Sequence, residues 1–469
     1  MGDRINILLI ISDQHRRDAA GCYGHPMVRT PNLDRLASMG TQFNRAYCQS
    51  PLCGPSRASI QTGQYPHTCR ALDNNEKVPV RVDAPWMGET FRRAGYVTGA
   101  IGKMHVMGET PERDLGYDER RLRFYTYDLQ DYIDVVGEEN KDRYMNNGVD
   151  IYNRENKPVD LAEELMFDAL VVERSKQFLN EHRDGPFFLC MGLEKPHPAW
   201  WAPSEFHDMY KPEDIDLPDD FGQKPVNVPE SQHWRMVVKD KVLERFSEPA
   251  ARNATAAYYA NVSYMDHNLG QLLSAVADLG LMDNTLIVYT SDHGEMLFDH
   301  TLIQKGYMYE GAVAVPLICV HPEHFPAGAQ CDEIVQLLDL FPTFMDAAGM
   351  EHPEGLEGES LLPVARGEAD TEGRAAFSEF YTWGSPWRMI RTPEFKYVHQ
   401  DTEIPQLYDM VNDPCETANL ATDAGFKAAC AELHERVMAD WEIPPQEEMI
   451  PRHGMYPWRG KPGGRDPER

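Results

Sequence analysis

The chain has 469 residues, of which 42% are hydrophobic and 26% are charged, a composition typical of globular proteins rather than of disordered or fibrous ones. Its formal net charge of -30 argues against nucleic acids and anionic membranes as partners, because proteins bind both through lysine and arginine. The length favours one large domain with a smaller one beside it. If the substrate is an anion, its site must be a local basic region within an acidic protein.

The cysteines and the apolar segments indicate the compartment. The nine cysteines are scattered and include no C-x-x-C pair, which favours a reducing compartment and argues against a disulfide framework or a zinc cluster. No segment reaches the roughly 20 apolar residues of a membrane-spanning helix. The early run NILLIIS is followed by Asp13 rather than by a small-residue cleavage site, so we interpret it as a buried strand and not as a signal peptide. We therefore expect a cytoplasmic protein.

Strand-like apolar runs alternate with helical segments along most of the chain, which predicts a mostly parallel sheet covered by helices. The segments 107–160 and 200–248 are rich in charge, proline and aromatic residues, and we expect them to form loops over one face. Strands are expected at 5–12, 96–101, 186–192, 285–291 and 315–320, and helices at 30–40, 162–182 and 250–279.

The pattern changes after about residue 365, where short strand-like segments such as AAFSEFYTW and PQLYDM predict a small antiparallel sheet. A helix at 423–440 and a polar tail follow it. The predicted fold class is α/β: a large, mostly parallel sheet sandwiched by helices over residues 1–365, with a smaller C-terminal α+β subdomain with an antiparallel sheet over residues 366–469.

Polar and ionisable side chains follow several of the predicted strands. In open parallel sheets, ligands bind just beyond the carboxyl ends of the strands. Each of these residues alone has an ordinary structural explanation, such as a turn aspartate or a surface lysine, but their shared placement at strand ends does not. We therefore predict a functional site at this edge, built from Asp13, Gln14, Lys103, His105, His197, Asp292, His293 and Lys305.

Cys53 begins the segment CGPSRASIQTG, in which Pro55 suits the first turn of a helix and Gly63 its end. This segment resembles the signature of the type I sulfatases, the formylglycine-dependent family in the alkaline phosphatase superfamily. The resemblance extends to NILLIISDQ, IGKMH, EKPHP, SDHGEMLFDH and the C-terminal LYDMVNDPCETANL, and so covers most of the chain.

The resemblance implies that Cys53 is oxidised after translation to formylglycine (3-oxoalanine) by a formylglycine-generating enzyme. The hydrated aldehyde would attack the sulfur of a sulfate ester, displace the alcohol and later expel inorganic sulfate. The resemblance also implies one divalent cation, Ca²⁺ in the first place with Mn²⁺ or Mg²⁺ as alternatives. Its expected ligands are Asp13, Gln14, Cys53, Asp292 and His293. Gln14 replaces a commoner second aspartate, which gives the metal site one negative charge fewer.

By the same resemblance, Arg57, Lys103 and Lys305 would hold the sulfate oxygens and the charge that develops on them. His105 or His197 would transfer a proton, either from the covalent intermediate or to the leaving alcohol. The alcohol pocket is expected to involve aromatic residues of the inserted loops and of the small domain: Trp200, Trp201, Trp234, Trp383 and Trp387.

The expected function is a sulfatase that hydrolyses a small anionic sulfate monoester of a carbohydrate or an aryl alcohol. A phosphonate monoester hydrolase or phosphodiesterase of the same superfamily is the alternative, because such relatives share the formylglycine and metal machinery. Lys103 and His105 favour the sulfatase. A third interpretation, from a different class, is an inactive binding protein in which Cys53 stays a thiol. The sequence leaves the oligomeric state open.

Overall fold

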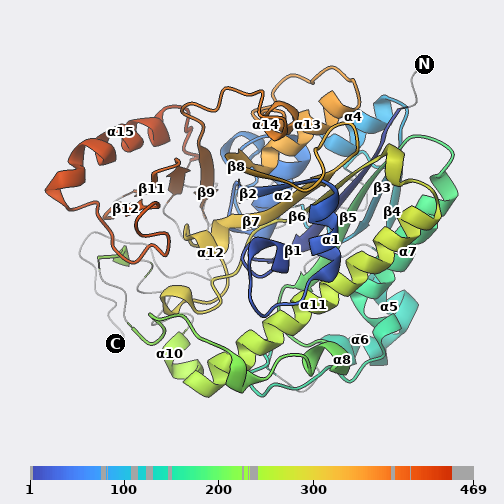
Figure 1. Ribbon diagram of the computed structural model, residues 1–469, viewed down its shortest axis with the longest axis horizontal. Helices are drawn as coiled ribbons and strands as arrows, with labels where there is room; N and C mark the ends of the chain where they lie inside the picture. The colour runs from blue at the N-terminus through green and yellow to red at the C-terminus, as the bar shows by residue number, and fades with distance from the viewer. Residues whose placement is uncertain are drawn as a thin grey trace.

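Figure 1 presents a computed structural model of the protein, in which an eight-stranded sheet lies between two layers of helices. The structure describes residues 4–74, 81, 83–106, 115–122, 130–145, 150–223, 227–230, 232, 241–381, 386–401 and 403–445. The strands are β1 (Asn6–Asp13), β2 (Thr41–Tyr47), β3 (Val97–Gly102), β4 (Glu119–Arg121), β5 (Phe187–Pro196), β6 (Thr285–Ser291), β7 (Ala314–Val320) and β8 (Ala329–Gln336). Their order across the sheet is β4-β3-β5-β1-β6-β7-β2-β8.

The large sheet is mostly parallel, as predicted. Only β7 runs against its neighbours, since it pairs antiparallel with both β6 and β2 while all other adjacent pairs in this sheet are parallel. Strand β1 is buried along its whole length, which explains its run of five apolar residues from Ile7 to Ile11, because a central parallel strand is covered on both faces.

Successive side chains of β1 point to opposite faces and enter two different cores. Leu8 and Ile10 belong to the core beneath α1 (Pro31–Met39), α7 (Phe167–His182) and α11 (Glu248–Asp278). Ile7, Leu9 and Ile11 belong to the core on the other face. There the covering helices are α2 (Cys53–Thr62), α4 (Met87–Arg93), α13 (Leu340–Ala347) and α14 (Leu361–Ala365).

The C-terminal segments form the predicted separate antiparallel sheet, with strand order β12-β11-β10-β9. Its strands are β9 (Ala376–Phe380), β10 (Trp387–Arg391), β11 (Phe395–Gln400) and β12 (Gln406–Asp409). Helix α15 (Lys427–Met438) packs on this sheet through Leu433 and Val437. The domain boundary between residues 365 and 366 stays a prediction.

The two segments expected to be loops are not free of regular structure. Their described parts contain the short helices α5 (Gln130–Val136), α6 (Glu138–Met145), α8 (Ser204–His207) and α10 (Val242–Arg245). That expectation was therefore wrong in part, because helices of four to eight residues are too short to give a clear periodicity.

All nine cysteines lie in described segments and are free, as the scattered spacing predicted. Within the described part of the chain, none of the helices combines the length and the apolar content that crossing a bilayer requires. The cytoplasmic location stays a prediction.

Candidate active site

The central strands bring two carboxylates together at the sheet edge. Asp13 is the last residue of β1, and Asp292 directly follows β6. The two strands are parallel neighbours with Ser12 opposite Ser291, so the residues that follow them meet. The backbone N–H of Gln14 donates to Asp292 Oδ1 at 3.1 Å, which ties the two strand ends to each other.

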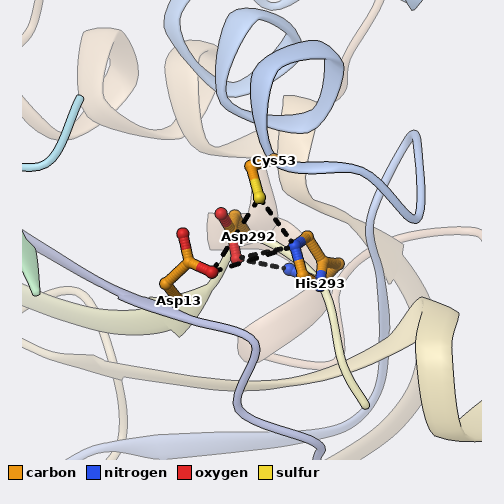
Figure 2. A group of neighbouring side chains, drawn as sticks. All are labelled: Asp13, Cys53, Asp292 and His293. Atoms are coloured by element: carbon orange, nitrogen blue, oxygen red, sulfur yellow. Dashed lines mark hydrogen bonds and ion pairs between the residues drawn. The ribbon is translucent and has the colours of Figure 1, made fainter. Parts of the chain in front are cut away.

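Cys53 faces these carboxylates from the first residue of α2 (Figure 2). Its Sγ lies 3.2 Å from His293 Nε2 and 3.9 Å from Asp13 Oδ1. All four side chains are buried, and one ligand atom from each of Asp13, Cys53, Asp292 and His293 lies within 4.8 Å of the others. This is the spacing at which several side chains can share one metal ion.

Arg57 stands one turn further along α2 and joins the two carboxylates. Its Nε donates to Asp292 Oδ2 at 2.7 Å, its Nη2 lies 3.2 Å from Asp13 Oδ2, and its Nη1 donates to the backbone carbonyl of Lys103 at 2.6 Å. The Arg57 side chain is 1% exposed and both carboxylates are fully buried. Burial raises the pKa of Asp292, an increase that Arg57 only partly offsets.

Two lysines add positive charge to the same cluster. Lys103, after β3, lies 2.8 Å from Asp13 Oδ2. Lys305 donates to Gln14 Oε1 at 2.6 Å and to Cys53 Sγ at 3.1 Å. Burial opposes ionisation of Asp13, but Lys103, His197, Lys305 and Arg57 hold its pKa well below the usual range. The cluster is therefore a basic region inside an acidic protein, as the sequence required for an anionic substrate.

The same charges act on the Cys53 side chain. Burial and the Asp13 carboxylate raise the pKa of the thiol, whereas Lys305, His293 and a hydrogen bond with His105 lower it. The lowering effects are larger, so the pKa of Cys53 lies well below its usual range. The site thus stabilises negative charge at the position of the residue 53 side chain.

His197 follows β5 and approaches the cluster from the opposite side of β1. Burial, Lys305 and Lys103 lower its pKa well below the usual value, so the ring is neutral near pH 7. Its Nδ1 lies 2.5 Å from the carbonyl oxygen of Pro198, which can only accept a hydrogen bond. Nδ1 therefore carries the ring proton, and Nε2 is the unprotonated nitrogen.

Asp168 of α7 holds the backbone that leads to His197. Its two oxygens accept hydrogen bonds from the backbone N–H groups of Glu194 and Lys195, at 2.8 and 3.0 Å. Burial raises the pKa of Asp168 to about 6, although these two hydrogen bonds lower it. A buried carboxyl group thus fixes the last residues of strand β5, just before the site.

One residue of this region was not predicted. Glu295 is fully buried and accepts hydrogen bonds from the Gln14 side chain and from the backbone N–H of Leu297. Burial raises its pKa, and hydrogen bonds from Leu297, Gln14 and Gln304 offset part of that increase. The available signal was its position two residues after His293, on the motif SDHGEMLFDH.

The prediction of an aromatic alcohol pocket was wrong for the described tryptophans. Trp200 is 0% exposed, and both Trp201 and Trp387 are 1% exposed. The indole N–H groups of Trp200 and Trp201 donate to backbone carbonyls, so these rings are satisfied core residues rather than an open surface for a substrate. Trp234 and Trp383 lie outside the described residues.

Comparisons with known proteins agree with this geometry. Residues 5–350 match the model of the sulfatase family, and residues 298–442 match that of the N-sulphoglucosamine sulphohydrolase C-terminal region. An arylsulfatase of Clostridium perfringens is 30% identical over 93% of this chain and 94% of its own length. An N-acetylglucosamine-6-O-sulfatase of Bacteroides thetaiotaomicron is 28% identical over 92% and 85%, respectively.

A solved structure extends the comparison to the fold. The phosphonate monoester hydrolase of Agrobacterium radiobacter superposes with a TM-score of 0.83 at 25% identity, covering 93% of this chain and 95% of its own. The sulfatase match spans well over half of the chain, and the resemblance inferred from the sequence is confirmed. The protein belongs to the sulfatase family, within the alkaline phosphatase superfamily, and is a sulfuric ester hydrolase.

Proposed function

We propose that the protein hydrolyses a sulfate monoester of a carbohydrate or an aryl alcohol, with residue 53 as the nucleophile after its conversion from cysteine to formylglycine. The observation that carries this proposal is the contact of Cys53 Sγ with Lys305 and His293 beside two strand-end carboxylates. The arylsulfatase and N-acetylglucosamine-6-O-sulfatase relatives support the two alcohol classes. The formylglycine would supply a hydroxyl nucleophile that can later eliminate sulfate.

The buried donor set fits a hard divalent cation. Asp13 and Asp292 offer carboxylate oxygens, Gln14 offers its amide oxygen, and His293 offers Nε2. Oxygen-rich sites of this kind suit Ca²⁺, with Mn²⁺ or Mg²⁺ as alternatives. When bound, the ion would neutralise sulfate oxygens and favour ionisation of the nucleophile. In the structure Cys53 Sγ stands at the position that the oxygens of formylglycine would take.

The two lysines and Arg57 would have different electrostatic roles. Lys305 contacts the residue 53 side chain at 3.1 Å, and we propose that it and Lys103 hold the sulfate oxygens as charge develops. All the contacts of Arg57 described above are with carboxylates and a backbone carbonyl. That arrangement favours a role in fixing Asp13 and Asp292 over direct contact with sulfate.

Proton transfer would fall to the two histidines. His105 is hydrogen-bonded to the Cys53 side chain, which favours it for taking a proton from residue 53. His197 would exchange a proton only at Nε2, because Nδ1 is held by the carbonyl of Pro198. Because Nε2 of the neutral ring is unprotonated, we propose that His197 first takes up a proton there and then donates it to the ester oxygen of the leaving alcohol.

A phosphonate monoester hydrolase remains the second candidate, because one such enzyme shares the fold closely. A sulfate group has only oxygens beyond the ester bond, whereas a phosphonate monoester carries a carbon substituent that needs space. Lys103 and His105, which follow β3 by one and three residues, would occupy that space. This argument favours the sulfate ester.

The test compares kcat/KM for 4-nitrophenyl sulfate, a 6-O-sulfated glucosamine and 4-nitrophenyl phenylphosphonate. The protein is produced together with a formylglycine-generating enzyme, and Cys53→Ala is the control. We expect a sulfate ester to be the best substrate and peptide mass spectrometry to find residue 53 lighter than cysteine. Higher kcat/KM on the phosphonate than on both sulfates, or full activity with an intact thiol, would contradict the proposal.

A further inference from the structure

The side-chain amide of Gln14 has a defined orientation. Gln14 is fully buried beside Asp13, and its Oε1 accepts a hydrogen bond from Lys305 at 2.6 Å while its Nε2 donates to Glu295 Oε2. Exchanging the two ends of the amide would place Oε1 against a carboxylate and Nε2 against an ammonium group. Only the observed orientation satisfies both neighbours.

The backbone of Gln14 is fixed as well. Its φ angle is 67°, in the left-handed region, where a glutamine needs support from its surroundings. Its N–H donates to Asp292 Oδ1, and its carbonyl accepts from the hydroxyl of Tyr258 at 2.8 Å. Backbone and side chain together leave Gln14 one arrangement, with Oε1 turned towards Lys305, which also contacts Cys53 in the proposed cation site.

Glu295 connects this amide to the segment that carries Lys305. One of its oxygens accepts from Gln14, and the other accepts from the backbone N–H groups of Leu297 and Gln304. Gln304 directly precedes Lys305 in the chain. Each of these three contacts is with an N–H donor, so the Glu295 carboxyl group acts as an acceptor.

We propose that Glu295 is a positioning residue that holds the Gln14 amide with Oε1 towards the cation site and Lys305. The proposal rests on the divalent cation of the proposed function. A carboxylate at position 14 would face Glu295 with a second negative charge, whereas the Gln14–Glu295 pair carries one charge and one hydrogen bond. A glutamine at position 14 is therefore a better neighbour for the Glu295 carboxylate than a second acidic residue would be.

A purely structural role predicts something different. If Glu295 only holds the backbone of Leu297 and Gln304, then Glu295→Gln has the same effect whatever residue occupies position 14. If Glu295 orients Gln14, its amide variant keeps a single oxygen, which the backbone N–H groups of Leu297 and Gln304 engage, and so it presents its N–H groups to those of Gln14. In a Gln14→Glu background the same variant instead restores a donor facing an acceptor.

The experiment measures the affinity of the EDTA-treated full chain for calcium chloride by isothermal titration calorimetry. The proteins are the unaltered chain, Glu295→Gln, Gln14→Glu and the double variant. We expect Glu295→Gln to weaken Ca²⁺ binding by about tenfold or more alone, since one well-oriented ligand contact is at stake. In the Gln14→Glu background, the added Glu295→Gln substitution should leave the Ca²⁺ affinity equal to that of Gln14→Glu alone or raise it.

Asp339→Asn is the matched control. Asp339 is also buried and accepts from two backbone N–H groups, those of Gln336 and Glu359, each at 2.9 Å. It is not among the contacts of Cys53, so the control should lower thermal stability without changing Ca²⁺ affinity.

Equal losses of affinity from Glu295→Gln in both backgrounds would overturn the proposal and leave Glu295 a structural residue. Failure of the unaltered chain to bind Ca²⁺, Mn²⁺ or Mg²⁺ would instead overturn the cation of the proposed function, and this inference with it. If Glu295→Gln does not fold alone, recovery of folding in the double variant supports the pairing. Failure to fold in both backgrounds contradicts it.

Discussion

The substitution Arg57→Met tests the electrostatic centre of the site. Arg57 is 1% exposed and spans two fully buried carboxylates, at 2.7 Å from Asp292 and 3.2 Å from Asp13. Methionine keeps much of the apolar stem but removes every donor. The variant therefore leaves two buried carboxylates without the guanidinium that joins them.

Removing one partner of a buried ion pair costs about 3–5 kcal/mol of stability, because the remaining charge is desolvated and unpaired. We expect the lower end of that range, about 3 kcal/mol, without metal, because Lys103 still contacts Asp13 at 2.8 Å and the backbone N–H of His293 still donates to Asp292 at 2.9 Å. A bound cation would neutralise the same oxygens, so the loss should be smaller in Ca²⁺ than in EDTA.

The assay is urea unfolding followed by tryptophan fluorescence, in EDTA and in excess Ca²⁺. Arg143→Met is the control, because Arg143 pairs with Glu139 at 2.8 Å on α6 while the two side chains are 50% and 80% exposed. The control should change stability by about 0.5 kcal/mol or less. A loss below about 1 kcal/mol for Arg57→Met in EDTA would refute the argument from burial. Equal losses in both conditions would refute a cation between these carboxylates.

Three further predictions use other parts of the site. Burial raises the pKa of Asp168 to about 6, so the folded protein binds a proton more readily than the unfolded chain and stability should fall as pH rises from about 4 to about 6. Asp168→Asn should reduce this slope in urea midpoints, and the remainder would come from groups such as Asp266, whose pKa is also raised to about 6. A Cβ at Gly192 would lie 1.9 Å from the carbonyl oxygen of Lys103, whereas one at Gly185 would meet nothing within 4 Å. Because the added methyl group would displace Lys103, Gly192→Ala should lower kcat/KM by about tenfold or more, and Gly185→Ala should leave it unchanged. Lys103→Ala should reduce kcat/KM on 4-nitrophenyl sulfate more than on 4-nitrophenyl phenylphosphonate, and an equal reduction would contradict its proposed contact with sulfate oxygens.

The central strands of the large sheet could be predicted from the sequence. Strands β1 and β6 have apolar central residues and are buried along their whole length, and their predicted bounds are within one residue of the observed ones. Strands β2 and β8 were not predicted, because TQFNRAY and AQCDEIVQ mix polar with apolar residues and both contain partly exposed positions. The reversed direction of β7 could not be predicted, because a run of apolar residues is compatible with either strand direction.

The site was predictable because parallel strands end at a common edge, so Asp13 and Asp292 could be placed together from strand ends alone. Glu295 could not, because its contacts depend on how the segment 294–312 folds back on itself. There Met296 and Gln304 pair through their backbones, as do Phe298 and Leu302. The tryptophan prediction failed for a related reason: sequence composition cannot tell whether an indole faces solvent or, like Trp200, packs in the core with its N–H bound to a carbonyl.

The chain as a whole is strongly negative, whereas the site gathers positive groups, and this difference determines how an anionic ester is bound. The net charge of -30 repels an anion at long range, but at physiological salt charges separated by more than about 8 Å are largely screened. Within that distance the ester would meet Lys103, Lys305 and the cation, while Arg57 is already paired with both carboxylates. Recognition of the sulfate group must therefore come from short contacts inside the site rather than from steering by the protein surface. Those contacts depend on buried groups such as Asp168, which holds the backbone before His197, and Glu295, which holds the backbone before Lys305 and, as proposed above, the Gln14 amide.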